Sequence, residues 1–186
     1  MYILSSKELL TAEDSQYEED QVVFESSVPG TYNVELLVDG KYEVYIVAGG
    51  GKGHHHKTSH ISGIAYGGGS GSGFVGIVKL PKGIIPVIVG SGDTNGSGGK
   101  NSCIGNFVTT YGGYPADRSG NASGGAVPTV NTEIISTTIN RAGYTGTGRD
   151  QSSSVYGGYG YGGSGDSSDS QQYGGNSYVK IIYKGK

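Results

Sequence analysis

The chain has 186 residues, including 37 glycines, 5 prolines and a single cysteine, and its formal net charge is −3 at pH 7. The small net charge argues against a disordered polyelectrolyte, and 13 basic against 16 acidic residues lack the excess that nucleic-acid binding needs. Collagen is excluded because no Gly-X-Y repeat runs through the chain, and one cysteine leaves neither an internal disulfide nor a cysteine-rich zinc site.

Residues 1–20 form a polar, acidic lead-in that we expect to be an attachment arm or a frayed terminus. Residues 7–13 within it would form a short helix only on a docking surface. Charge comes too early for a signal peptide, and no run approaches the ~18 apolar residues of a membrane span, so synthesis in a cytoplasm is expected. The remaining residues, 21–186, are expected to form one glycine-rich β domain.

Strand signals begin directly after the arm. Residues 21–25 are rich in β-branched and aromatic side chains, and residues 32–38 and 41–48 alternate apolar with polar. The Asp39-Gly40 pair between the two alternating runs predicts a β-hairpin with a type I′ turn, since that turn needs positive φ at both central residues.

Further strands are expected at 74–80, 84–89, 102–110, 132–139 and 177–184. Pro81-Lys82-Gly83 joins the first two of these as a strand pair. The run 84–89 is apolar on both faces, as in a buried strand, but Pro86 predicts an edge position or a bulge because proline cannot donate to a ladder. Valine and isoleucine far outnumber leucine, so the expected fold class is all-β, with a small β-sandwich-like core.

Glycine-rich stretches separate the strands, at 49–73, at 90–101 and above all at 111–176. Such stretches are typical of flexible linkers. The alternative is a set of packed polyproline-II helices, in which glycine at every third position lets backbones touch and hydrogen-bond to one another. Gly157, Gly160 and Gly163 have that spacing, and both possibilities stay open at this point.

Two motifs in these stretches imitate nucleotide-binding loops. Residues 71–76, GSGFVG, match the dinucleotide fingerprint, but that fingerprint needs a strand before it and a helix after it, and here a loop precedes and a strand-like run follows. Residues 96–102, GSGGKNS, lack the first glycine and the Ser/Thr of a P-loop and predict a tight turn with residues 93–95. These glycines therefore predict structure rather than nucleotide binding.

The order of several stretches resembles a known family. The stretches are Val28-Pro29-Gly30-Thr31-Tyr32, the strand with its glycines at 42–51, the run 67–93, and the closing GGNSYVKIIY at 174–183. Together they resemble the glycine-rich domain of bacteriophage tail fibres and virion appendage proteins over residues 21–186. The resemblance implies a β-sandwich-like core with long glycine-rich loops, a homotrimer, no catalytic motif, and a place in the virion after synthesis in a bacterial cytoplasm.

Four histidines gather in HHHKTSH: His54, His55, His56 and His60. On an extended chain His54 and His56 project to the same side, and imidazole suits Fe, Zn, Ni or Cu. In a three-fold fibre, three copies would bring six imidazoles to one transition metal. The alternative is a solvated polar loop, since no carboxylate or cysteine is close in the sequence.

Tyrosines are the second candidate signal, because seven of the 15 lie within residues 111–176. They are Tyr111, Tyr114, Tyr144, Tyr156, Tyr159, Tyr161 and Tyr173. Tyrosine among Gly, Ser and Asn is the mixture of antibody loops, so we expect a receptor-binding surface for a host-cell glycan or protein, with the last five as candidates. The alternative is that these rings pack on glycine backbones and order the loops.

No catalytic arrangement is visible in the sequence. Asp166 and Asp169 lie in a serine-rich loop without a base or an apolar wall, and Cys103 lies in an expected strand without a group that would lower its pKa. We expect a non-enzymatic virion protein of tail-fibre or adhesin type, whose arm contacts other virion proteins and whose loops contact the host surface. The alternative is a purely structural component, such as a collar, baseplate, head decoration or fibre spacer; ice binding is a remote third possibility.

Overall fold

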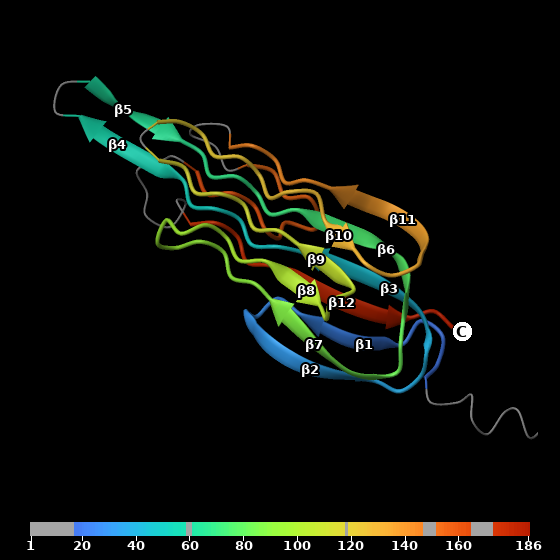
Figure 1. Ribbon diagram of the computed structural model, residues 1–186. Coiled ribbons are helices and arrows are strands. Elements are labelled where there is room, and N and C mark those ends of the chain that lie inside the picture. Colours follow the sequence, from blue (N-terminus) through green and yellow to red (C-terminus); the bar gives the residue numbers. More distant parts are fainter. Residues whose placement is uncertain (1–16, 59–60, 118, 147–151, 165–172) are drawn as a thin grey trace, which may run out of the picture.

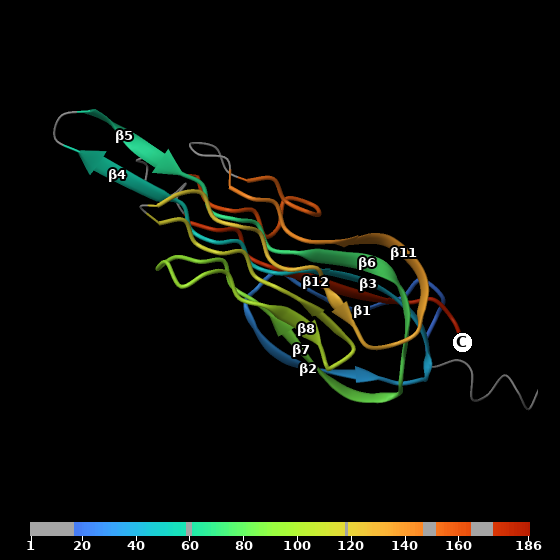
Figure 2. The same ribbon diagram turned by 45° about the horizontal axis from the view of Figure 1, so that its top comes forward.

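The computed structural model describes residues 17–58, 61–117, 119–146, 152–164 and 173–186. This part of the chain is elongated, with a β-sandwich at one end, glycine-rich segments leading out of it, and a separate β-hairpin at the far end (Figures 1 and 2). The C-terminus lies at the sandwich end (Figure 1). Strands are the only regular elements assigned in the described residues, and no helix among them could cross a membrane.

Two antiparallel sheets of five strands form the sandwich. Sheet A has the order β1 (Val22–Ser26), β12 (Tyr178–Tyr183), β3 (Gly40–Val47), β6 (Gly73–Leu80) and β11 (Ile134–Arg141). Sheet B has the order β10 (Thr129–Val130), β9 (Val108–Thr110), β8 (Ser102–Ile104), β7 (Gly83–Val89) and β2 (Gly30–Leu36). The distal hairpin pairs β4 (His54–Thr58) with β5 (Ile61–Tyr66). The all-β prediction is confirmed, and the sandwich agrees with the expected core.

The core lies between the two sheets and follows the alternation of the strands. Sheet A contributes Tyr42, Val44 and Ile46 of β3, which are fully buried, and sheet B contributes Val34 and Leu36 of β2, which are also buried. The strands that contribute to this core turn their apolar faces inward, and removing that surface from water at about 25 cal/mol per Å² is what holds the sheets together.

The hairpin expected around Asp39-Gly40 is wrong. β2 pairs with β7 in sheet B, whereas β3 pairs with β12 and β6 in sheet A, so the chain crosses from one sheet to the other at this point. Gly40 does not have a positive φ, and a Cβ there would lie 2.8 Å from the Tyr183 ring. Asp39 accepts a hydrogen bond from the Lys82 backbone N–H at 2.8 Å, so it ties two crossovers together.

The pairing expected across residues 81–83 is also wrong, since β6 lies in sheet A and β7 in sheet B. β7 is an interior strand of sheet B, so Pro86 is not at an edge. The ladder between β7 and β8 covers only Val87 and Ile88, and the Pro86 carbonyl accepts from the Gly105 N–H at 2.7 Å just beyond it. The missing N–H of Pro86 therefore lies where the ladder has already ended.

The remaining expected strands are present with shifted ends. Residues 21–25, 132–139 and 177–184 correspond to β1, β11 and β12. Residues 102–110 form two strands, β8 and β9, which pair with each other around a turn in which Gly105 has φ +53°.

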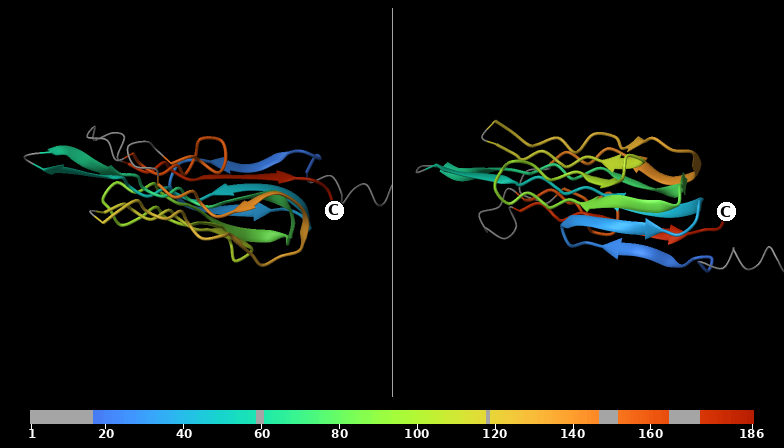
Figure 3. Two further views of the ribbon diagram at one scale, coloured as in Figure 1. Left: turned by 90° about the horizontal axis from the view of Figure 1, so that it is seen from above. Right: turned by 60° about the horizontal axis from the view of Figure 1, so that its bottom comes forward.

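The glycine-rich stretches are ordered wherever they are described. They supply segments that lie side by side, which we call the glycine bundle: 48–53, 67–72, 90–93, 98–101, 111–116, 121–125, 142–146, 160–164 and 173–177. The segments run side by side away from the sandwich (Figure 3). Their N–H groups donate to carbonyls of neighbouring segments, as from Gly51 to Gly69 at 2.8 Å and from Gly163 to Gly51 at 2.8 Å.

Glycine is required in the bundle because the backbones touch. A Cβ built on Gly50 would lie 1.8 Å from the Tyr161 carbonyl oxygen, and one built on Gly51 would lie 1.9 Å from the Tyr114 carbonyl oxygen. Segment 48–53 is the centre of the bundle. Its neighbours, by hydrogen bond or close approach, are segments 67–72, 90–93, 98–101, 111–116, 160–164 and 173–177.

The contacts repeat every three residues, which is the period of a polyproline-II helix. Gly50 and Gly53 both face segment 160–164, Gly68 and Gly71 both face segment 48–53, and Gly143 and Gly146 both face segment 67–72. The spacing noted in the sequence at Gly157, Gly160 and Gly163 is a different feature, since Gly157 and Gly160 have positive φ and lie in a turn and just after it.

Candidate functional site

Polar side chains complete the hydrogen bonding of the glycine bundle. Where no carbonyl reaches a glycine-segment N–H, a side-chain oxygen accepts instead: Asn121 Oδ1 from Gly67 at 2.8 Å and Asn176 Oδ1 from Gly92 at 2.9 Å. Ser102, fully buried, accepts from Gly90 at 3.0 Å. Buried N–H groups need partners, so the serines and asparagines scattered among the glycines have a structural role.

Asp93 is the most buried acidic side chain that the structure describes, at 3% exposure. Its Oδ1 accepts from the N–H groups of Asn95, Gly96 and Ser97, and its Oδ2 accepts from those of Gly98 and Lys52 at 2.9 and 3.2 Å. Burial alone would raise the pKa of Asp93, but these backbone hydrogen bonds, led by that of Gly98, outweigh it and hold the pKa below its usual value. The tight turn predicted here is confirmed, whereas the link to Lys52 was not foreseen.

The described turns that join bundle segments lie at the end of the bundle away from the sandwich. The distal hairpin joins segments 48–53 and 67–72, and Asp93–Gly98 joins the next pair (Figure 1). Between a third pair, 111–116 and 121–125, Asp117 and Gly120 form an antiparallel bridge. The Ala116 N–H donates to the Lys52 carbonyl at 2.8 Å, so the start of the third turn is tied to segment 48–53. We call this end the tip.

The candidate metal ligands His54 and His56 are both on β4, in the distal hairpin at the tip. The chain is extended there, as expected, and pairs with β5 rather than forming a loop. Asp117 lies near His54: the Ser119 hydroxyl lowers the pKa of Asp117 most, and His54 contributes less. Within the described part of one chain no three His, Cys, Asp or Glu side chains are grouped to hold a metal, and His60 lies outside it.

Two of the five tyrosine candidates lie together on the sandwich. Tyr159 stacks on Tyr178 of β12 with ring centroids 4.5 Å apart, and Tyr156 lies against both Tyr178 and Tyr45 at 6.2 and 5.3 Å. All four rings are on the outer face of sheet A. The Tyr178 hydroxyl donates to Glu25 at 2.8 Å.

These rings belong to a strap, residues 152–162, that folds back from the bundle onto sheet A. Ser152 and Gly162 form an isolated antiparallel β-bridge. The backbone N–H of Tyr159 donates to the Tyr156 carbonyl at 3.1 Å, across the turn Gly157-Gly158. The two glycines have φ +59° and +80°, as the central residues of a type I′ turn require. Tyr156 and Tyr159 therefore make the intramolecular packing that was the alternative to receptor contact.

The other three candidates are separate from this group and from one another. Tyr144 lies under the Arg141 guanidinium at 4.1 Å, the Tyr161 ring occupies the space beside Gly175, and Tyr173 is 40% exposed with the Lys52 ammonium 5.4 Å from its centroid. Tyr114, which was not among the candidates, is 61% exposed. Sequence composition marks tyrosine-rich stretches but carries no signal for which ring faces solvent.

The acidic and thiol groups considered for catalysis do not form a site in the described residues. Burial raises the pKa of the Cys103 thiol, which makes it a weak nucleophile at neutral pH. Asp166 and Asp169 lie outside the described residues. No known protein-family model matches this chain, and no curated protein matches it.

Proposed function

We propose that this chain is a non-enzymatic virion protein of bacteriophage tail-fibre or adhesin type that presents its tip to the surface of a host cell, a glycan or a protein. The observation that carries the proposal is the separation of two ends. A sandwich with the described C-terminus forms one end, and the distal hairpin of β4 and β5 and the turn Asp93–Gly98 lie at the other.

The glycine bundle suits such a role because it is a spacer with fixed shape. Lateral hydrogen bonds and backbone contact replace the flexibility expected of glycine tracts, so the tip is held at a defined distance from the sandwich. Binding by preordered turns avoids the entropy of ordering loops on contact. Tyr173 and Tyr114 offer exposed aromatic area for sugar or protein contact.

The purely structural alternative, a collar, baseplate, head decoration or spacer, needs the sandwich and the bundle but no chemistry at the tip. The two proposals differ in whether the isolated protein adheres to cells. The expected arm was residues 1–20, but Tyr17 and Asp20 are hydrogen-bonded to the domain, so residues 1–16 would contact other virion proteins under both proposals.

The experiment compares cell attachment by labelled wild-type protein with that of a tip variant and a matched control. In the tip variant a Gly-Ser linker replaces residues 55–65, which leaves Gly53 and Gly67 in their bundle contacts. The control is Ile135→Lys on β11 of the sandwich, a residue 43% exposed. Attachment lost only in the tip variant supports the adhesin; wild-type protein that attaches to no strain in a bacterial panel supports the structural role.

A further inference from the structure

The two sheets differ in what covers their outer faces. On sheet A the strap lies across Tyr45 and Tyr178, leaving Tyr178 only 8% exposed. On sheet B the outward side chains of β7 are open: Ile84 is 69% and Ile88 is 39% exposed, and Pro86 between them is exposed as well. The ribbon shows β7 and β8 unobstructed by other described elements (Figure 1).

This apolar row lies on an almost uncharged surface. The outward neighbours of the row are Thr31, Asn33 and Glu35 on β2, and Cys103 on β8. Glu35 is the one charged residue in the strands of sheet B, whereas the strands of sheet A carry Glu25, Lys41, Glu43, Lys79, Arg141 and Lys180. Three adjacent apolar side chains on a sheet face with so little charge are typical of an interface rather than of a solvent-exposed surface.

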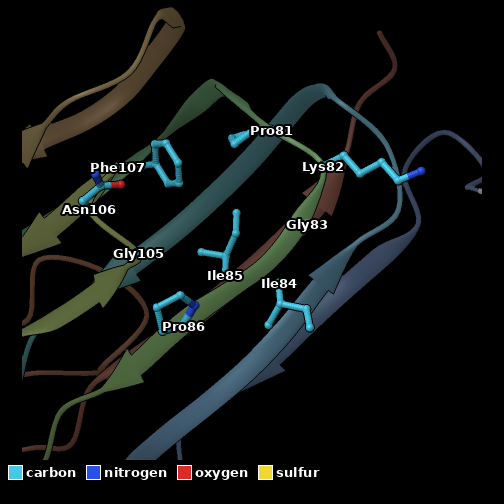
Figure 4. A pocket seen from close by; sticks show the side chains of 9 residues that line it. All are labelled: Pro81, Lys82, Gly83, Ile84, Ile85, Pro86, Gly105, Asn106 and Phe107. Atoms are coloured by element: carbon cyan, nitrogen blue, oxygen red, sulfur yellow. The ribbon is translucent and has the colours of Figure 1, made fainter.

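A groove continues the apolar surface towards the base of the sandwich. It has a volume of about 410 Å³ and lies between the β6–β7 crossover and the β8–β9 turn. Ile85 points towards the Phe107 ring across it, and Ile84 points away from both (Figure 4). Ile84 and Pro86 also line the groove, so it borders the row at the Ile84 end of β7.

The row is its own complement under two-fold symmetry. Ile84, Pro86 and Ile88 read the same in both directions, so a rotation about an axis through Pro86 places an isoleucine opposite an isoleucine. The two-fold axis can run across the strands or along them. If it runs across them, Glu35 faces Thr31 of the other copy; if it runs along them, Glu35 faces the β8–β9 turn of the other copy. The two Glu35 side chains never meet, and isologous contacts of this kind are the commonest in oligomers.

We propose that the outer face of sheet B binds a second copy of this chain, forming a two-fold dimer in which β7 packs on β7, in place of the homotrimer that the resemblance implies. β2 and β7 have seven residues each, whereas β8 and β9 have three each. With strands ~4.8 Å apart and a rise of ~3.3 Å per residue, the face of these four strands is ~320 Å² before side-chain relief is counted. That is below the ~800 Å² per partner of a standard interface. The dimer is therefore weak and depends on concentration.

Residues 1–16 are the competing occupant, since the chain enters the fold at Tyr17, whose hydroxyl donates to the Glu35 carbonyl at 3.0 Å. Their charges are Lys7, Glu8, Glu13 and Asp14, a net negative segment that would meet Glu35 with like charge. The second copy brings no such repulsion, which is why it is preferred.

Sedimentation equilibrium of the full chain over a wide concentration range tests the proposal. Wild-type protein is expected to move from monomer to dimer, and Ile84→Lys with Ile88→Lys is expected to raise the dissociation constant by about thirtyfold or more, as loss of central apolar contacts does. Both side chains are exposed in the monomer, so the fold is retained; an unchanged near-ultraviolet circular dichroism spectrum checks this.

Ile135→Lys serves again as the control, since it adds the same charge on sheet A and should leave dimerisation unchanged. A wild-type chain that stays monomeric at every concentration, forms a trimer, or dimerises equally well as the double variant overturns the proposal. The readout is mass, so it is independent of whether the tip attaches to cells.

Discussion

The rings of Tyr159 and Tyr178 stack at 4.5 Å with an interplanar angle of 10°, joining the strap to the outer face of sheet A. Nineteen positions of chain separate the two residues, and this stretch leaves the sandwich along the bundle before returning as β12. The stack therefore fixes the strap, and through it segment 160–164, to the sandwich.

Tyr159→Ala is expected to lower the free energy of unfolding by about 1–2 kcal/mol, since aromatic stacking and buried ring area are lost together. Urea denaturation followed by tyrosine fluorescence measures this, and hydrogen exchange should show faster exchange at residues 152–162. Tyr159→Phe keeps the ring and should match wild type. Equal loss in both variants would mean that the hydroxyl, and not the stack, holds the strap.

Gly50→Ala should disrupt the bundle, because the new Cβ would lie 1.8 Å from the Tyr161 carbonyl oxygen, a backbone atom that cannot rotate away. The matched control is Gly120→Ala, where nothing lies within 4 Å of the new Cβ and φ is not positive. We expect a loss of at least ~3 kcal/mol at Gly50 and a change within ~0.5 kcal/mol at Gly120. Thermal unfolding and limited proteolysis distinguish them; similar melting temperatures would contradict the packed bundle.

The sequence predicted the strands well and their pairing badly, for a physical reason. Alternation at residues 32–38 and 41–48 reports that each strand has one buried face, and that holds for β2 and β3. It does not report which neighbour donates the ladder bonds, so an Asp-Gly pair is compatible with a hairpin and with a crossover between sheets. Only the long-range partners, β7 and β12, decide between these.

The packing of the bundle and of the strap could not be predicted from local sequence patterns for the same reason: it depends on long-range partners. Every glycine segment is equally permissive alone, and order arises when a particular carbonyl, such as that of Tyr161 beside Gly50, occupies the space of the absent side chain. Likewise, Tyr156 and Tyr159 have the composition of a binding loop, yet Tyr178 and Tyr45 on sheet A are their partners. Which candidate ring stays exposed, as Tyr173 does at 40%, therefore depends on long-range packing.

Asp93→Asn tests whether a buried carboxylate holds the tip turn to the centre of the bundle. The amide nitrogen would face N–H donors, either those of Gly98 and Lys52 or those that now meet Oδ1, so a donor opposes a donor. We expect the free energy of unfolding at pH 7 to fall by about 2–4 kcal/mol, as for loss of hydrogen bonds to a buried charge. Asn121→Asp, which keeps its acceptor oxygen for Gly67, is a mild counterpart at another turn.

Lowering the pH should remove the difference in unfolding free energy between the wild-type protein and Asp93→Asn. The folded pKa of Asp93 lies below the unfolded value of about 3.9, so the stabilisation is complete above that value and is lost as the pH falls through the folded pKa. Glu25 and Asp117, whose pKa values are also lowered, titrate in both proteins and cancel in the comparison. Urea unfolding of the two proteins from neutral pH to below pH ~4 should therefore show a gap that narrows only at the acid end. A gap that stays constant would mean that the shape of the Asp93 side chain, and not its charge, closes the turn.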